Sequence, residues 1–215
     1  MKKIIAIIAL ALGFAASANA QFGVIGGFTS SHTNIKGVDW ISEAQNANLW
    51  HAGIAYKFEI GPFFTVQPAL VYQTKGSVVK DDLRTLTSNG GFVELELGAQ
   101  VGIDLLAVRP FFLLEPFIGY QVYGQDAVAM ASAVDINSLN QYVSDAKNKL
   151  EGGFGIGAGI EIIEHIQLSV QWFMNVGKLY NGDKLAANAA WNAATSGYKD
   201  INNYQGIKIT AGIFF

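Results

Sequence analysis

Residues 206–215 at the end of the chain read GIKITAGIFF, and this stretch decides the fold. Ile207, Ile209 and Ile213 occupy one set of alternate positions, whereas Lys208 belongs to the mixed set between them. Successive side chains of a β-strand point to opposite faces of the sheet, so this period of two predicts a strand. One face of that strand is apolar and the other face is mixed.

Seven further segments show the same alternation. It is regular in 93–103, 153–162 and 166–174, and less regular in 21–30, 48–59, 63–75 and 111–123. The eight predicted strands are roughly 10–13 residues long, and a tilted strand needs about 9–11 residues to cross a membrane. Beyond the first 20 residues no segment holds 18 consecutive apolar residues, which excludes a helical membrane protein.

The composition excludes several classes of protein. Hydrophobic residues make up 51% of the 215 residues and charged residues only 14%, against roughly 25% charged in ordinary soluble domains. So hydrophobic a chain can bury enough apolar surface to fold, which excludes disorder. The absence of cysteine excludes a disulfide scaffold and a thiolate metal site. A net charge of -3 without a basic stripe argues against a nucleic-acid partner, and we expect no cofactor.

The first 20 residues have the pattern of a secretory signal peptide. Two lysines precede the apolar run 4–16, and Ala18-Asn19-Ala20 forms a small-x-small cleavage site. The apolar run is too short for a membrane anchor, because a span needs about 20 residues. We therefore predict a signal peptide at residues 1–20 and a single mature domain at residues 21–215.

The connections between the predicted strands alternate in length. The long ones cover 31–47, 76–91, 124–150 and 178–203, and the short ones centre on 60–62, 104–110 and 163–165. Outer-membrane barrels have short periplasmic turns and longer external loops. The pattern therefore predicts an eight-stranded antiparallel transmembrane β-barrel in the outer membrane of a Gram-negative cell, with both termini in the periplasm.

Three of the long connections carry helical patterns. Asp135 can cap an amphipathic segment that ends at Leu150, Asp183 can cap an alanine-rich segment that ends at Ser196, and residues 39–46 can add a short turn. We therefore expect long, partly helical extracellular loops. Such loops either rest on the barrel mouth or form a cap that binds an extracellular ligand or gates the barrel.

Closure of the barrel follows from the solvent around it. In lipid every backbone N–H and C=O must find a partner within the protein, and a sheet achieves this only by closing. The apolar rows then face lipid, and aromatic residues gather at the two membrane interfaces. We expect one such girdle at the short-turn end (Phe58, Phe64, Phe112 and Phe215) and one at the long-loop end (Trp50, Tyr72, Tyr120 and Trp172).

The inward rows carry a cluster of charged residues. On this parity the lumen receives Lys57, Lys75, Glu94, Glu96, Glu115, Glu161 and Lys208. Eight strands leave an interior just wide enough for side chains to fill, and unpaired buried charges are costly. We expect these groups to pair and to pack the lumen. The alternative is a narrow polar path, which the glycines at 153, 155, 157 and 159 favour by removing side-chain volume.

No catalytic constellation or metal site is visible in the sequence. The three histidines are scattered without a metal-ligand spacing, and no G-x-S-x-G motif is present. Glu94 and Glu96 resemble a catalytic carboxylate pair, but lysines are at hand to pair with them. We expect a non-enzymatic barrel with a structural, surface-interaction or limited small-solute permeability role. The alternatives are a barrel enzyme acting on lipid or envelope substrates, and a secreted lipocalin-like binder with apolar residues inside.

Two segments carry a resemblance to a known family. Residues 63–76, FFTVQPALVYQTKG, and 92–97, FVELEL, resemble strands of the small outer-membrane β-barrel proteins of Bacteroidetes, often called porin-family or PorT-like barrels. Glu96 stands where that family usually has proline. The terminal Phe215 resembles the signal read by outer-membrane insertion machinery. The resemblance implies a barrel whose partners are outer-membrane lipid and that machinery, and it implies location and fold more than activity.

Overall fold

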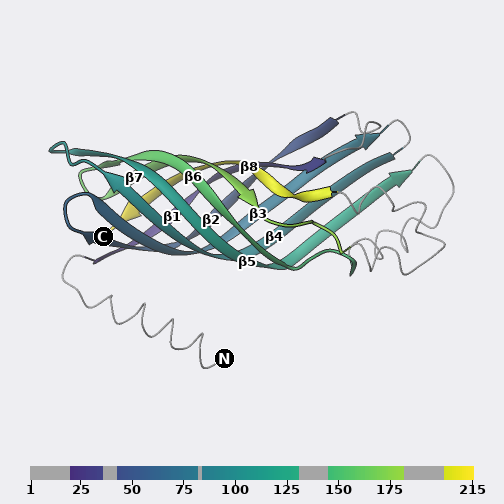
Figure 1. Cartoon of the computed structure of the whole chain (residues 1–215), viewed down its shortest axis with the longest axis horizontal. Helices are drawn as coiled ribbons and strands as arrows, with labels where there is room; N and C mark the ends of the chain where they lie inside the picture. The colour runs from purple at the N-terminus through teal and green to yellow at the C-terminus, as the bar shows by residue number, and fades with distance from the viewer. Residues whose placement is uncertain (1–19, 36–42, 82–83, 131–144, 182–200) are drawn as a thin grey trace, which may run out of the picture.

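The computed structural model describes residues 20–35, 43–81, 84–130, 145–181 and 201–215 (Figure 1). Eight antiparallel strands form one closed barrel, in which each strand pairs with its neighbours in the chain and β1 pairs with β8. The predicted eight-stranded barrel is thereby confirmed. The strands are β1 (Ala20–Ile35), β2 (Glu43–Ile60), β3 (Phe64–Asp81), β4 (Arg84–Gly102), β5 (Val108–Met130), β6 (Leu150–Ile162), β7 (Ile166–Asn175) and β8 (Ile201–Phe214).

The alternating rows point in the directions that the sequence predicts. In β8, Ile207, Ile209 and Ile213 are each at least half exposed on the outer surface, whereas Lys208 is only 5% exposed. Soluble proteins rarely expose a contiguous apolar surface of this extent, so the outer surface is suited to lipid. A soluble lipocalin-like binder would have the reverse arrangement, and that alternative is wrong.

β1 and β8 close the barrel. Gly23 of β1 lies opposite Phe214 of β8, and the pairing continues along both strands. Beyond this pair the amide of Phe215 donates to the carbonyl of Phe22 at 2.8 Å. A Cβ on Gly23 would lie 2.5 Å from the Phe214 ring, so glycine at this position lets the ring lie inside the barrel. The last strand is therefore paired along both of its edges.

Three short turns join strands at the end of the barrel that holds the C-terminus (Figure 1). They join β2 to β3, β4 to β5 and β6 to β7, as the sequence predicts. Gly61, Leu106 and Glu164 in these turns have positive φ angles of 68°, 59° and 62°. The left-handed backbone conformation at these residues reverses the chain within a few positions.

β3, β4 and β5 are longer than the sequence predicts. The pairing of β3 with β4 continues to Asp81 opposite Arg84, so the predicted long connection 76–91 is wrong and these residues form a β-hairpin. The pairing of β4 with β5 likewise reaches Met130. In the sequence of 76–91, polar residues such as serine and threonine are mixed with valine and leucine in both alternate sets of positions. The hydrophobic period of two is therefore lost there, although the backbone pairing continues.

The expected loop helices fall mainly on residues 131–144 and 182–200, which lie outside the described residues. Where the expected helical segments overlap the described residues, the prediction of helix is wrong in two places. Residues 43–46 belong to β2, and Lys147 forms an isolated bridge with Tyr180 shortly before β6 begins. Among the residues that the structure describes, no helix has the length and hydropathy that a membrane span requires.

Replacing Ile209 by arginine tests whether the outer row faces lipid. On the flanking strands Ile209 lies opposite Phe28 and Val170, which are also exposed outward. We expect Ile209→Arg to lose about 2–4 kcal/mol of folding free energy in lipid vesicles, against about 0–1 kcal/mol for Ile166→Arg beside a turn. Urea titration in vesicles measures both values, and equal losses would contradict the difference in depth.

Candidate functional site

The structure places the seven predicted lumen residues inside the barrel. Lys57, Lys75, Glu94, Glu96, Glu115, Glu161 and Lys208 are each at most 6% exposed. They do not form a single group. Their ion pairs divide them into three clusters, each built around one lysine. We call these the turn-side cluster around Lys57, the central cluster around Lys208 and the loop-side cluster around Lys75.

The turn-side cluster lies next to the short turns. The ammonium group of Lys57 donates to Glu161 at 2.6 Å and to the backbone carbonyl of Glu164 at 3.1 Å. It also lies 3.4 Å from the carboxylate of Glu59, which is partly exposed. Arg109, near the start of β5, lies 3.6 Å from Glu161. β2, β5 and β6 together hold this cluster and tie it to the turn between β6 and β7.

The central cluster crosses the middle of the lumen. Lys208 of β8 donates to Glu96 of β4 and to Glu115 of β5, both at 2.7 Å. The amide of Gln171 donates to the same oxygen of Glu115 at 2.6 Å. Because β8 and β4 are not neighbours in the barrel, these bonds connect opposite walls. The central cluster therefore closes the lumen across its width.

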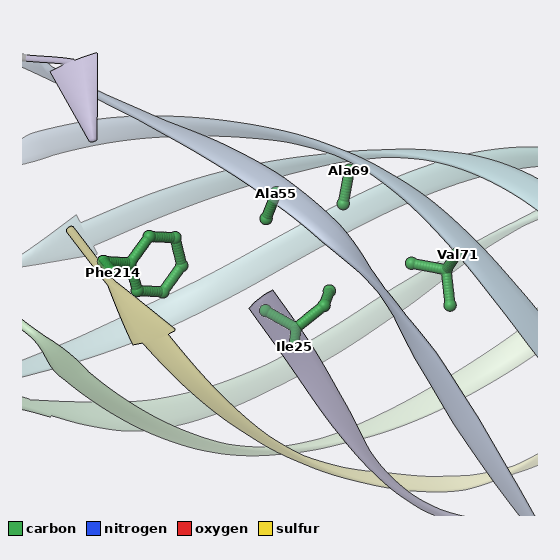
Figure 2. Packing of buried hydrophobic residues seen from close by; sticks show 5 residues of the cluster. All are labelled: Ile25, Ala55, Ala69, Val71 and Phe214. Atoms are coloured by element: carbon green, nitrogen blue, oxygen red, sulfur yellow. The ribbon is translucent and has the colours of Figure 1, made fainter. Parts of the chain in front are cut away.

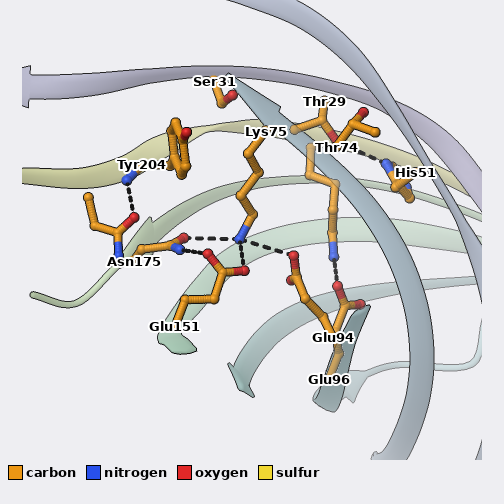
Figure 3. Close-up of polar contacts among 12 residues, drawn as sticks. Thr29, Ser31, His51, Thr74, Lys75, Glu94, Glu96, Glu151, Asn175 and Tyr204 are labelled. Carbon is orange, nitrogen blue, oxygen red and sulfur yellow. Dashed lines mark hydrogen bonds and ion pairs between the residues drawn. The ribbon is translucent and has the colours of Figure 1, made fainter. Parts of the chain in front are cut away.

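The loop-side cluster surrounds Lys75 (Figure 3). Its ammonium group donates to Glu151 at 2.9 Å and to Asn175 at 3.1 Å, and it lies 3.1 Å from Glu94. Asn175 in turn donates to Glu151. Aromatic rings complete the surroundings of the ammonium group, with centroid distances of 5.4, 4.5 and 5.2 Å to Phe92, Phe117 and Phe173. Cation–π attraction adds to the ion pairs here, because the lysine is fully buried.

Charge in the lumen is close to balanced. Five lysine or arginine side chains and five glutamates are buried in the described part of the chain. The central and loop-side clusters each place one lysine between two carboxylates. A buried ion is stable only when its partners offset the loss of water, so each lysine is held by both carboxylates that it contacts.

Glu94 and Glu96 are divided between two lysines. Glu94 pairs with Lys75 in the loop-side cluster, and Glu96 pairs with Lys208 in the central cluster. The two carboxylates therefore belong to separate ion-pair clusters, each of which employs its carboxylate to neutralise a buried cation. Among the described residues no group of histidine and carboxylate side chains has the arrangement of a metal site.

The glycine row of β6 accommodates neighbouring side chains. A Cβ on Gly153 would lie 2.6 Å from the ring of Phe117, and a Cβ on Gly159 would lie 2.4 Å from the ring of Phe111. The positions between them are filled in the same way by Gln171. The volume that these glycines release is therefore occupied by side chains from neighbouring strands.

The opposite wall of the lumen is apolar in part (Figure 2). Its buried cluster draws on β1, β2, β3 and β8 and consists of Ile25, Ala55, Ala69, Val71 and Phe214. A cavity of about 20 Å³ lies beside Lys208, and its lining includes Ile25 of this wall together with Glu96 and Glu115. That volume holds about one water molecule. Charged groups and apolar groups thus pack against each other at mid-lumen.

Several buried polar residues are not predicted from the sequence. Glu151 and Asn175 complete the loop-side cluster, and His51 lies 3.0 Å from the hydroxyls of both Thr29 and Thr210. Glu151 has the same parity as the inward row of β6, but the predicted strand began two residues later. His51 shares the parity of Lys57 in β2, which is the signal that could have placed it in the lumen.

Comparison with protein families decides the family of this chain. Residues 14–181 match the model of a family described as "Outer membrane protein beta-barrel domain". The chain belongs to this family. Its members are barrels of the outer membrane, which agrees with the apolar outer surface and the charged interior. The outer membrane is therefore the location of this barrel.

Two solved structures have a similar arrangement of the chain. Ail, the attachment invasion locus protein of Yersinia pestis, is 12% identical, with a TM-score of 0.44 and coverage of 92% of this chain and 99% of Ail. Neisserial surface protein A is 11% identical, with a TM-score of 0.47 and coverage of 91% of this chain and 97% of its own. No curated protein matches the sequence.

Replacing Lys208 by methionine tests the central cluster. The substitution keeps much of the side-chain volume but leaves Glu96 and Glu115 without the cation that both contact. We expect a loss of about 3–5 kcal/mol in folding free energy, because the buried carboxylates lose their counter-ion. Adding Glu115→Gln to Lys208→Met should restore part of the lost folding free energy, because one of the two unpaired carboxylates is then removed.

Lys149→Met is the matched control, because Lys149 is exposed at the loop end of the barrel. It should change stability by less than about 0.5 kcal/mol. Urea titration in vesicles measures all three variants. A loss for Lys208→Met no larger than that for Lys149→Met would show that the central ion pairs do not stabilise the barrel.

Proposed function

We propose that the protein is an outer-membrane barrel with a closed lumen and a structural and surface-interaction role. The observation that carries this proposal is the central cluster, in which Lys208 binds Glu96 and Glu115 across the lumen beside a cavity of about 20 Å³. A solute path would require these bonds to break and the side chains to leave the axis. The same packing argues against the second candidate, a path of limited permeability for small solutes.

The orientation of the barrel in the membrane is part of this proposal. Short turns join the strands at one end, and in outer-membrane barrels such turns face the periplasm. Both β1 and β8 have their terminal ends on that side, so the two termini are periplasmic. We also propose that residues 1–20 are removed as a signal peptide and that Phe215 is read by the insertion machinery.

The long strands supply the surface for interaction outside the cell. β3 continues from Tyr72, in the proposed outer aromatic girdle, to Asp81, and β4 and β5 run alongside it. At about 3.3 Å per residue, this amounts to roughly 30 Å of strand beyond the girdle. Hydrogen bonds inside the extension, such as 3.0 Å between Thr33 and Ser77 and 2.8 Å between Ser88 and Tyr204, hold its wall together. We propose that a ligand of the cell exterior would contact this extension.

The proposal includes a non-enzymatic role and a place among the Bacteroidetes barrels. Each carboxylate of the three clusters is engaged by a lysine, which leaves it poorly placed as a general acid or base. The segment 63–76, with its QPALVYQTKG sequence, supports the Bacteroidetes branch by resemblance.

Planar-bilayer recording tests the closed lumen. We expect the folded protein to show no steady conductance in 1 M salt, because paired side chains occupy the axis at three levels. Comparison of boiled and unboiled samples by SDS gel mobility verifies that the inserted protein is a folded barrel. Steady, discrete conductance steps from such a sample would contradict the proposal and favour a permeability role.

Single-cysteine labelling tests the orientation, because the chain has no cysteine of its own. Lys149→Cys is exposed at the loop end, and Leu106→Cys is exposed in the turn between β4 and β5. We expect a membrane-impermeant maleimide to label Lys149→Cys on intact cells and Leu106→Cys only after the outer membrane is permeabilised. The reverse pattern would place the termini outside the cell.

A further inference from the structure

Two prolines stand inside the strands of the barrel wall. Pro68 lies in β3 and Pro116 in β5, and each is midway between the two expected aromatic girdles. Proline has no N–H to donate, so within sheets it is normally found only on edge strands or at bulges. A closed barrel has no edge strand, and each proline therefore removes one hydrogen bond from a ladder between two strands. In lipid no water can replace that bond.

The pairing of β4 with β5 is interrupted at Pro116. The pairing is regular on both sides of residues 97–98, which it omits, and it keeps the same register across them. In this register Leu97 lies opposite Pro116, so the carbonyl of Leu97 receives no backbone hydrogen bond from β5. No extra residue is inserted here, which distinguishes the interruption from a β-bulge. We call residues 96–99 of β4 and 114–117 of β5 the interrupted seam.

The central cluster lies directly behind the interrupted seam. Glu96 comes immediately before Leu97 in β4. Glu115 comes immediately before Pro116 in β5, so the two buried carboxylates face the lumen on the two sides of the seam. Nζ of Lys208 donates to both carboxylates at 2.7 Å. One ammonium group of β8 therefore ties β4 to β5 from inside the barrel, at the level where the backbone bond between them is missing.

Lys208 also offsets a repulsion across the interrupted seam. Glu96 and Glu115 are buried carboxylates on neighbouring strands, and like charges that face each other across a strand pair destabilise the pairing. The ammonium group of Lys208 contacts both and attracts both. Its removal would leave two negative charges to repel each other across the seam, where the backbone is least able to resist.

We propose that Lys208 is an electrostatic clamp that keeps the interrupted seam closed, so that the wall between lumen and lipid does not open there. This local task is distinct from the closure of the lumen across its width. The amide of Gln171 donates to the same oxygen of Glu115 as Lys208 does, which holds the carboxylate of β5 in position for the clamp.

The pair of β2 and β3 provides an internal comparison. Its pairing is interrupted at Pro68 in the same way, and the neighbouring lumen residues are Lys57 and Gln67. Lys57 donates to Glu161 of β6, whereas Gln67 accepts from Gln100 of β4. Within the described part of the chain no side chain bonds to both Lys57 and Gln67, and these two residues are not like charges. The second interruption is therefore a matched control, because it has neither the repulsion nor the clamp.

Amide hydrogen exchange of the folded barrel in detergent micelles, resolved by NMR, tests the clamp. We expect Lys208→Met to accelerate exchange in 96–99 and 114–117 at least about tenfold more than in the control ranges 55–58 and 66–69, because the seam then opens locally. An equal acceleration in both places would show that Lys208 stabilises the barrel only as a whole. That result, or the absence of any acceleration at the seam, would overturn the proposal.

Replacing proline by valine separates the clamp from general stabilisation. Valine suits a strand and returns the missing N–H. We expect Pro116→Val to reduce the acceleration caused by Lys208→Met at the interrupted seam to less than about threefold, because a backbone bond then holds the two strands. Pro68→Val is the matched control and should leave that acceleration unchanged. Equal effects of the two valine substitutions, or no effect of Pro116→Val, would contradict the clamp.

SDS gel mobility of unboiled samples decides the case in which Lys208→Met does not fold. We then expect Pro116→Val to restore the folded band in the Lys208→Met background, because it repairs the seam that lost its clamp. Pro68→Val should not restore the band. Rescue by neither substitution, or by both equally, would also overturn the proposal.

Discussion

The pairing of every backbone amide and carbonyl within the protein is the constraint on which this structure depends. Lipid offers no hydrogen bonds, so an open sheet would leave two unsatisfied edges in the hydrocarbon. The seam between β1 and β8 removes both edges, and glycine at position 23 makes room for Phe214 where the seam begins. Once eight strands are closed, the width of the lumen is set, and the inward side chains must share a narrow space. Closure is thus the reason why the inward charged side chains lie close enough to pair.

The buried ion pairs in turn specify how the strands are matched. A shift by one residue in the register of β8 would move Lys208 from the lumen to the lipid and Ile209 from the lipid to the lumen. Lys208 contacts carboxylates from two strands on the other side of the barrel, Glu96 of β4 and Glu115 of β5. These contacts require β8 to be in the correct register relative to strands with which it shares no backbone hydrogen bond. Apolar packing alone tolerates many arrangements, whereas a lysine between two glutamates tolerates few. The clusters therefore contribute specificity as well as stability.

The sequence predicts the barrel well and the site in part, for physical reasons that differ. The period of two is local, so the faces of Ile209, Lys208, Glu94 and Glu96 can be read from a few neighbours. The partner of each charge is not local, because it depends on strand register and on the stagger around the barrel. The sequence predicts that Lys75 pairs in the lumen, but it does not identify Glu151 as a partner, because the glycine-rich start of β6 hides the strand boundary and the predicted strand begins at residue 153. The sequence does not predict the β3–β4 hairpin, because polar and apolar residues are mixed in both alternate sets of positions of 76–91 and periodicity then carries no signal.

The two ends of the lumen differ because closure occurs at its centre. The turn-side cluster has an open cup of about 160 Å³, whereas the space beside Lys208 holds about one water molecule. Lys57 bonds to Glu161 at the turn end, whereas Lys208 bonds to Glu96 and Glu115 at the centre. The bonds of Lys208 are short, buried and shared by opposite walls, so they separate the space at the turn end from the rest of the lumen.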